Sequence, residues 1–277
     1  LLNKKHSIII MIELGDLREG ILPGSLIKFY ETVFELSNIE VIGIGANLGC
    51  LAGAVPNIDQ FTQLALYHEL LELKFKRKLQ LISAGSSAVL PLLLEGSLPK
   101  AINHFRIGEA IFLGTDLVNG GTLPGLKDDA VILEAEIAEI KEKGLVPLAE
   151  TISIAPFESE QVGEDLSPGQ RGYRALVSVG QLDTEITGLT PINSGYNIAG
   201  ASSDVAVVNI GDEQGGLKVG DTIKFRLNYA ALLRLMSGKY IEKVVSPSLD
   251  ELENLPESEL LEVEPAVETI EEDNDKQ

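Results

Sequence analysis

The first part of the chain, residues 1–125, alternates short apolar runs with stretches in which apolar side chains recur every three or four positions. The runs predict buried parallel strands, and the stretches predict helices packed on them. Strands are expected at residues 7–14, 40–45, 79–83 and 102–106. The predicted helix faces are formed by Leu26, Ile27, Tyr30, Val33 and Phe34, and by Phe61, Leu64, Leu71 and Phe75. Four successive strand–helix units indicate a parallel sheet or barrel.

In the second part of the chain, residues 128–246, hydrophobic side chains recur at every second position. Val131, Leu133, Ala135 and Ile137 alternate with Glu134 and Glu136. Such alternation is typical of half-buried strands, and similar runs are separated by turn signals. These runs lie at residues 174–180, 205–209 and 224–227, and the turn signals lie at Gly188, residues 193–195 and residues 219–221. We predict a β-rich domain here.

The number of strand–helix units is too small for a complete barrel. A TIM barrel uses about 250 residues for eight units, so residues 1–125 have room for about four. The predicted fold class is therefore α/β plus β, the C-terminal part of a TIM-type (β/α)8 barrel followed by a β-rich C-terminal domain. Because the chain starts with Leu1 and enters a strand almost at once, we expect an N-terminally truncated sequence that lacks the first half of the barrel.

Composition excludes several classes of protein. The 277 residues are 44% hydrophobic, which excludes a wholly disordered chain. No apolar run approaches the length of a membrane span, and no signal peptide is recognised. The single cysteine, Cys50, excludes an internal disulfide framework and favours a reducing, cytoplasmic environment.

The net charge of −20 argues against a nucleic-acid binder, which needs a basic surface. Much of this charge lies at the end of the chain, where residues 250–277 hold twelve acidic side chains and one basic one. We therefore predict that residues 247–277 form a disordered, solvated acidic tail that says little about the core.

Glycine and polar residues follow each predicted strand of the first part, at residues 15–20, 45–50, 83–87 and 104–109. In parallel α/β folds the functional site forms at the carboxyl ends of strands, where backbone N–H groups and hydroxyls can cradle a phosphate. For a single loop, simpler interpretations are available: the glycines form tight turns, Arg18 and Arg106 are solvated, and Ser86 and Ser87 cap a helix at residues 88–94. Repetition in four consecutive loops favours the phosphate site.

Other chemistries have less support. His6, His68 and His104 lie on different predicted elements without metal-ligand spacing, so no metal site is expected. The chain has neither a G-x-S-x-G nucleophile elbow nor a P-loop lysine motif. Cys50 has no neighbouring histidine in the sequence, which favours a small buried packing residue over a nucleophile.

Five segments together resemble the pyridoxal 5'-phosphate (PLP)-dependent alanine racemase superfamily, most closely its ornithine racemase branch. They are ELGDLREG at residues 13–20, GANLGC at 45–50, NHFRIGEA at 103–110, GASSD at 200–204 and FRLNY at 225–229. The resemblance runs in order from residue 8 to residue 245 and does not include the acidic tail. It implies a barrel joined to a β domain, and a homodimer whose active site takes residues from the partner's β domain.

The resemblance also implies roles for individual residues. Arg106 would face the pyridine nitrogen of PLP, Asn47 would lie against the ring, and Arg18 would lie near the phenolic oxygen. The implied phosphate-binding residues are Ser86, Ser87, Gly108 and Glu109, the last two through backbone N–H groups. Asp183, Asp204 and Ser237 are the implied residues on the substrate or partner side. An arginine donates a hydrogen bond without giving up its proton, so the ring nitrogen would stay unprotonated. An unprotonated ring is a weaker electron sink, which suits simple proton removal and return at Cα.

Three positions depart from the family pattern. No residue here corresponds to the Schiff-base lysine, so the sequence as given is expected to be inactive by itself. Gln181 stands where alanine racemases have a tyrosine base, a difference that the ornithine branch shares. Ser86 and Val205 stand where that branch usually has asparagine and histidine, which weakens the expectation of ornithine in particular.

The expected function is therefore a cytoplasmic, PLP-dependent amino-acid racemase that interconverts the L and D forms of ornithine or a similar amino acid. Two alternatives stay open. One is a non-catalytic or truncated relative, which the presence or absence of a lysine encoded upstream would distinguish. The other is an aldolase of the same fold acting on 3-hydroxy amino acids, which would need a metal cluster that the sequence does not show.

Overall fold

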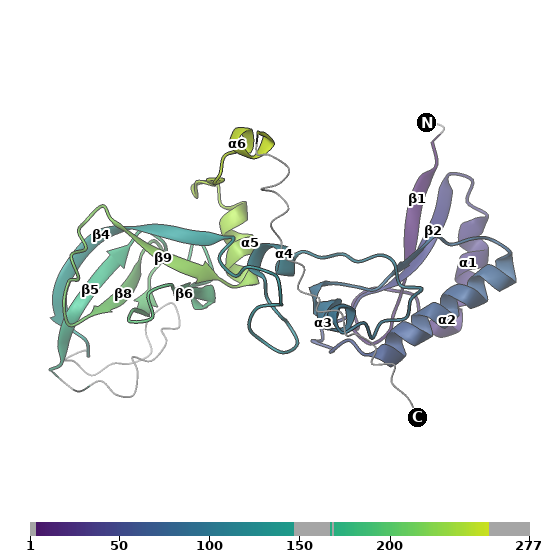
Figure 1. The fold of residues 1–277 in the computed structure, drawn as a ribbon, viewed down its shortest axis with the longest axis horizontal. Helices are drawn as coiled ribbons and strands as arrows, with labels where there is room; N and C mark the ends of the chain where they lie inside the picture. Colours follow the sequence, from purple (N-terminus) through teal and green to yellow (C-terminus); the bar gives the residue numbers. More distant parts are fainter. Residues whose placement is uncertain (1–3, 147–166, 168, 255–277) are drawn as a thin grey trace, which may run out of the picture. The chain divides into compact units, whose positions relative to one another are not determined.

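The computed structural model describes residues 4–146, 167 and 169–254, and its contacts divide the chain into two compact units. The first unit comprises residues 1–127 and the second unit residues 128–277. Each unit has its own hydrophobic core and is described by itself (Figure 1).

The first unit is built on a parallel sheet of three strands in the order β1-β2-β3. The strands are β1 (His6–Ile12), β2 (Ile39–Ala46) and β3 (Leu81–Ser83). They are connected by α1 (Leu26–Phe34) and α2 (Ile58–Phe75), as expected for parallel neighbours. Near the centre of the sheet, a Cβ on Gly43 would come within 2.4 Å of the carbonyl oxygen of Leu81, so β2 and β3 can approach only with glycine there.

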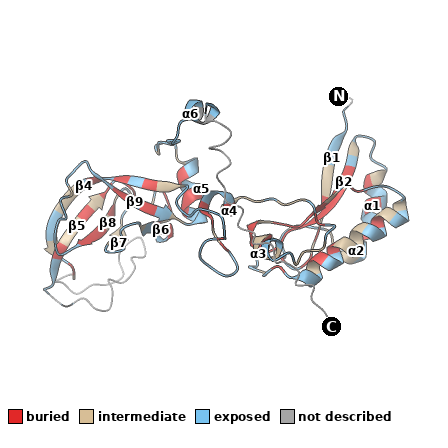
Figure 2. Cartoon of the chain, viewed as in Figure 1, coloured by how far each residue is buried: buried red, intermediate tan, exposed pale blue. Residues whose placement is uncertain are grey.

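Both long helices pack on the same sheet. Tyr30 of α1 stacks on Phe75 of α2 with ring centroids 6.5 Å apart, and Tyr30 is fully buried. Side chains from the strands complete this core, and buried residues are red in Figure 2. The apolar runs of the sequence predicted buried strands because these side chains are apolar. Four short helical segments complete the unit: η1 (Pro23–Ser25), η2 (Ser87–Val89), α3 (Leu90–Leu94) and α4 (Glu109–Leu113).

Two local predictions for this unit are wrong. Residues 102–106 form no strand but a single parallel bridge, between Ser83 and His104. The side chain of Asn103 takes the place of the missing ladder: its Oδ1 accepts from the N–H of Ile82 at 2.9 Å, and its Nδ2 donates to the carbonyl of Gln80 at 2.8 Å.

The expected serine cap of the helix at residues 88–94 is the second error. This segment begins as the 3₁₀ turn η2, and the side chain of Ser86 makes no capping hydrogen bond. Its Oγ donates instead to the carbonyl of Leu48, 3.2 Å away, and so joins the loop after β3 to the loop after β2.

The second unit contains an antiparallel sheet of six strands in the order β6-β9-β4-β5-β8-β7. The strands are β4 (Ile132–Gly144), β5 (Arg171–Val177), β6 (Leu189–Pro191), β7 (Asn197–Ala201), β8 (Ala206–Gly211) and β9 (Thr222–Leu227). Along β4, Leu133, Ala135 and Ile137 are buried while Glu134 and Glu136 are exposed, so the predicted alternation is confirmed. The turn η3 (Ile186–Gly188) and the helix α5 (Tyr229–Ser237) also belong to this unit.

The acidic end of the chain is described only in part. A short helix, α6 (Leu249–Glu253), lies at its start, and residues 255–277 lie outside the described residues. In the part of the chain that the structure describes, no helix has both the length and the apolar character needed to cross a bilayer.

Candidate functional site

Loops that follow the parallel strands of the first unit meet at one edge of the sheet. The side chain of Asn47, after β2, donates to Asp16, after β1, with 3.0 Å between Nδ2 and Oδ2. The backbone N–H of Arg106 donates to the carbonyl of Gly85, after β3, at 2.9 Å. Together with the bond from Ser86 to Leu48, these contacts link all the glycine-containing loops that the sequence singled out.

Arg106 is the central cation of this edge. Its Nη2 donates to the carbonyl of Ala46 and to Oδ1 of Asn47, each 3.2 Å away, and its Nη1 donates to the hydroxyl of Ser83. Partial burial of the guanidinium lowers the pKa of Arg106, although the residue still reaches solvent. Arginine remains charged at neutral pH because its ordinary pKa lies far above neutrality. The edge therefore presents a permanent hydrogen-bond donor.

Arg18 lies on the exposed side of the same loops and is paired with its neighbour. Its Nη2 donates to Oε1 of Glu19 at 2.9 Å. This pairing raises the pKa of Arg18 and lowers the pKa of Glu19. Both side chains act electrostatically on Arg106, so the three charges share one neighbourhood. Glu19 thereby offsets part of the positive charge that the two arginines bring.

Ser87, Gly108 and Glu109 come together where two short helices begin. Ser87 is buried, and its Oγ accepts from the backbone N–H of Ala110 at 3.2 Å. Gly108 precedes the first residue of α4, Glu109. Within the described residues the N–H groups of Gly108 and Glu109 donate no hydrogen bond, so both are available to an anion. Burial raises the pKa of the Glu109 carboxyl.

Two buried polar residues of this edge were not selected from the sequence. Asp16 is 1% exposed and Ser83 is fully buried. The sequence signal for each is its position: Ser83 ends a predicted strand, and Asp16 lies in the loop after another. Their roles depend on contacts with distant loops, which no local pattern shows.

Cys50 is exposed, so the prediction of a small buried packing residue is wrong. It follows Gly49, which has a positive φ of 80°. The Cys50 Sγ lies 3.4 Å from Oδ1 of Asn47, and its backbone N–H donates to Asp16. The residue therefore borders the same network.

The residues expected on the substrate or partner side lie in the second unit. Oδ2 of Asp183 accepts from the N–H of Gly180 at 3.0 Å, and Oδ2 of Asp204 accepts from the hydroxyl of Ser203 at 2.6 Å. Backbone hydrogen bonds join residues 181–182 to residues 202–203, so the two aspartates belong to adjoining loops. Ser237 lies on α5, where its Oγ donates to the carbonyl of Leu233.

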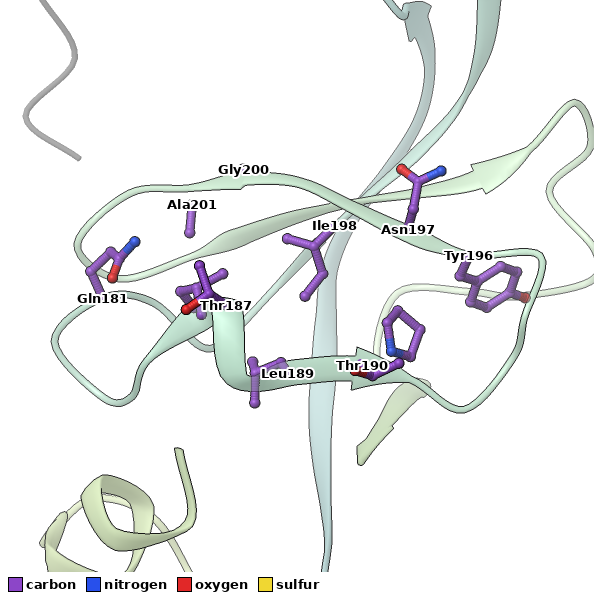
Figure 3. Close-up of a pocket in the computed structure, with 11 residues that line it drawn as sticks. Gln181, Thr187, Leu189, Thr190, Tyr196, Asn197, Ile198, Gly200 and Ala201 are labelled. Atoms are coloured by element: carbon purple, nitrogen blue, oxygen red, sulfur yellow. The ribbon is translucent and has the colours of Figure 1, made fainter. Parts of the chain in front are cut away.

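A cavity of about 330 Å³ also lies in the second unit, between η3, β6 and β7. Gln181 and Tyr196 stand at opposite ends of it, with Thr187 and Leu189 between them (Figure 3). Its lining includes no arginine, lysine, histidine or carboxylate. It has no charged group to neutralise a phosphate or a substrate carboxylate, and the edge around Arg106 is therefore the better candidate.

Comparison with known proteins identifies the family of the chain. Residues 1–116 match the family model described as the alanine racemase N-terminal domain. The chain is 39% identical to the ornithine racemase of Acetoanaerobium sticklandii over 243 residues, which cover 87% of this chain and 68% of that protein. The chain belongs to the alanine racemase family.

Other members extend the comparison. The chain is 35% identical to the lysine racemase of Thermotoga maritima over 250 residues, which cover 90% of this chain and 68% of that protein. The crystal structure of alanine racemase from the D-cycloserine producer Streptomyces lavendulae matches with a TM-score of 0.63 at 19% identity, covering 90% of this chain and 68% of that one. This likeness confirms the fold class expected from the sequence.

Alanine racemase family members depend on PLP, and the residues of this edge suit that cofactor. The described contacts of Arg106 engage only its Nη1 and Nη2 atoms, so its Nε–H has no acceptor among the described residues. The N–H groups of Gly108 and Glu109 suit a phosphate. A group of three or more His, Cys, Asp or Glu side chains able to hold a metal is not found in the described part of the chain.

Proposed function

We propose that this member of the alanine racemase family is a PLP-dependent racemase of a basic amino acid such as ornithine. The observation that carries the proposal is the placement of Arg106, a permanent donor held by Ser83, Ala46 and Asn47 where the strand-end loops meet. The names of the two relatives, an ornithine racemase and a lysine racemase, support a basic substrate.

PLP would supply a ring that withdraws electrons from the substrate and acidifies its Cα–H bond. Arg106 would donate a hydrogen bond to the ring nitrogen and keep its own proton. It would thereby limit how much negative charge the ring could accept, which would favour removal and return of the Cα proton over other bond cleavages. Asn47 would lie beside the ring and Arg18 near its phenolic oxygen.

The phosphate would lie against Ser86, Ser87, Gly108 and Glu109. Backbone N–H groups at the start of a helix bind anions because they point outward and carry partial positive charge. Ser87 keeps a hydroxyl proton to donate, since its oxygen is the acceptor in the bond from Ala110. These residues would fix the cofactor so that the ring stays within reach of Arg106.

The protein is also proposed to act as a cytoplasmic homodimer. In this arrangement Asp183, Asp204 and Ser237 of one copy would border the site of the other copy. A carboxylate there would suit the side-chain ammonium group of ornithine or lysine, because opposite charges attract strongly where water is excluded.

The test is an assay of the complete gene product with PLP and L-ornithine, L-lysine or L-alanine, followed by chiral chromatography. We expect D-ornithine or D-lysine to form, and Arg106→Ala to lower the rate by about 100-fold, the loss typical for one preorganised donor. Arg174→Ala is the matched control, because Arg174 also donates to an asparagine oxygen and a backbone carbonyl, but these belong to Asn209 and Leu145 in the second unit.

The proposal is wrong if no D-amino acid forms from any of these substrates, or if Arg106→Ala turns over at the wild-type rate. Thermal unfolding of both arginine variants separates a loss of chemistry from a loss of folding. Cleavage of L- or D-threonine to glycine and acetaldehyde in the same assay would indicate an aldolase instead.

A further inference from the structure

The Asp16 carboxylate is buried and fully engaged by the loop after β2. Its Oδ1 accepts from the backbone N–H groups of Cys50, Leu51 and Ala52, at 3.1, 3.2 and 3.3 Å. Its Oδ2 accepts from Nδ2 of Asn47 at 3.0 Å. Burial by itself raises the pKa of Asp16, but these four hydrogen bonds more than offset it, so the pKa lies below its usual value. The side chain is a buried anion at neutral pH.

The loop after β1 is shaped to direct Asp16 inward. Gly15 has a φ of 120°, and Leu17 has a φ of 58°, which a residue with a side chain rarely adopts. Glu13 holds this turn, since its Oε1 accepts from the N–H groups of Gly15 and Leu17. Leu17 itself is 75% exposed, so burial of its side chain does not explain the conformation. The turn instead places Asp16 against Asn47.

Asp16 thereby determines which way the Asn47 amide points. An ionised carboxylate only accepts hydrogen bonds, and a guanidinium only donates them. Asn47 lies between the two, so its NH2 group must face Asp16 and its oxygen must face Arg106. Oδ1 of Asn47 is indeed the atom 3.2 Å from Nη2 of Arg106. In the opposite orientation, donor would face donor and acceptor would face acceptor.

We infer that Asp16 is a positioning residue: through Asn47 it holds the Arg106 guanidinium in the orientation that meets the cofactor ring. The inference rests on the proposed function, in which Arg106 contacts that ring. Asp16 touches neither the ring nor the substrate in this account. It acts by keeping an acceptor, rather than a donor, in front of Nη2.

The test compares cofactor binding by four variants of the complete gene product. Pyridoxamine 5'-phosphate is the probe, because it keeps the ring nitrogen and the phosphate but has no aldehyde to react with lysines. In Asp16→Asn, Oδ1 still accepts from the three backbone N–H groups, but the new amide turns Asn47 around. We expect affinity to fall roughly tenfold, the cost of one unmatched buried polar contact.

A swap of the two side chains should restore binding. Asn47→Asp alone sets two carboxylates face to face and should weaken binding at least as much as Asp16→Asn. The double variant Asp16→Asn/Asn47→Asp again places a donor opposite an acceptor and leaves an oxygen facing Arg106. We expect its affinity to return to within about threefold of the wild type. If Asp16→Asn does not fold, comparison of Asn47→Asp with the double variant tests the same point.

The matched control is Asp116→Asn. Asp116 is also buried and also accepts from two backbone N–H groups and from an asparagine side chain, but that residue, Asn119, is not bonded to Arg106. Thermal unfolding is measured for every variant. We expect Asp116→Asn to lose stability without losing affinity, so that binding follows the atom facing Arg106 and not the stability.

Two results would overturn the role of Asp16 while leaving the proposed function in place: wild-type affinity in Asp16→Asn, or no recovery in the double variant over Asn47→Asp. Absence of binding by the wild type would contradict the proposed function and the role of Asp16 together.

Discussion

Arg106 is exposed, and among the described residues its guanidinium is hydrogen-bonded only to neutral acceptors: a hydroxyl, a backbone carbonyl and an amide oxygen. The carboxylate that acts electrostatically on Arg106, Glu19, is itself bonded to Arg18. Such an incomplete set of partners suits an arginine that receives a further acceptor when a cofactor binds.

Glu109 leads to a prediction about pH. Because burial raises its pKa in the folded protein, its charged form opposes folding: its contribution to stability is present below the ordinary carboxyl pKa and is lost as pH rises through the folded pKa. Glu109→Gln should therefore raise the melting temperature at pH 7 and leave it unchanged at a pH where the carboxyl is protonated in both states.

Thermal unfolding across this pH range checks the prediction, with Glu136→Gln as the exposed control on β4. The same substitution removes a negative charge next to the proposed phosphate position, so cofactor affinity at pH 7 should rise. Equal melting temperatures for Glu109→Gln and the wild type at pH 7 would contradict the assigned burial effect.

The start of α2 connects helix stability to the site. The Asn57 side chain accepts from the N–H of Gln60, and Oε1 of Gln60 accepts from the N–H of Asn57, which together form a capping box. Nε2 of Gln60 also donates to the carbonyl of Leu14 at 2.7 Å, in the turn that leads to Asp16. One residue thus caps the helix and fixes the loop after β1.

Substitutions of Asn57 and of Gln60 should differ in their effect on cofactor binding. Asn57→Ala should cost about 1 kcal/mol of stability, as for a typical N-cap, with little change in cofactor affinity. Gln60→Ala should cost a similar amount of stability and also weaken cofactor binding, because the loop after β1 loses its hydrogen bond to α2. Asn228→Ala, which removes the cap of α5 in the second unit, is the control for stability alone. Unchanged cofactor affinity in Gln60→Ala would contradict a role for the hydrogen bond from Gln60 to Leu14 in cofactor binding.

Periodicity alone predicted α1, α2 and β4, because each has enough apolar positions to define a face, but it gave no helix at α5, which is as long as α1. It failed at residues 102–106, where the side chain of Asn103 competes with the backbone for the ladder of β3. It also failed at Ser86, whose hydroxyl bonds to Leu48, far away in the sequence. The loops of the site were predictable as strand ends, but the link from Asp16 through Asn47 to Arg106 depends on which loops meet.

At the scale of the whole molecule, each unit carries its own core. The buried side chains of the second unit's core come from residues 133–235, without a contribution from the first unit. We therefore predict that residues 128–246, expressed alone, fold into a β-rich domain with cooperative thermal unfolding. Circular dichroism checks this, with the complete gene product as the reference. A non-cooperative melt without a β-sheet spectrum would contradict the domain boundary at residues 127–128.

The central claim is that the edge around Arg106 supports removal and return of the Cα proton of a basic amino acid. The most direct measurement follows the Cα proton signal of L-ornithine and L-lysine by NMR in D2O, with the complete gene product and PLP. We expect the signal to disappear as deuterium is incorporated, and chiral chromatography of the same samples to show the D form. Arg106→Ala should slow both changes by about 100-fold. Full retention of the Cα proton with PLP bound would contradict the central claim.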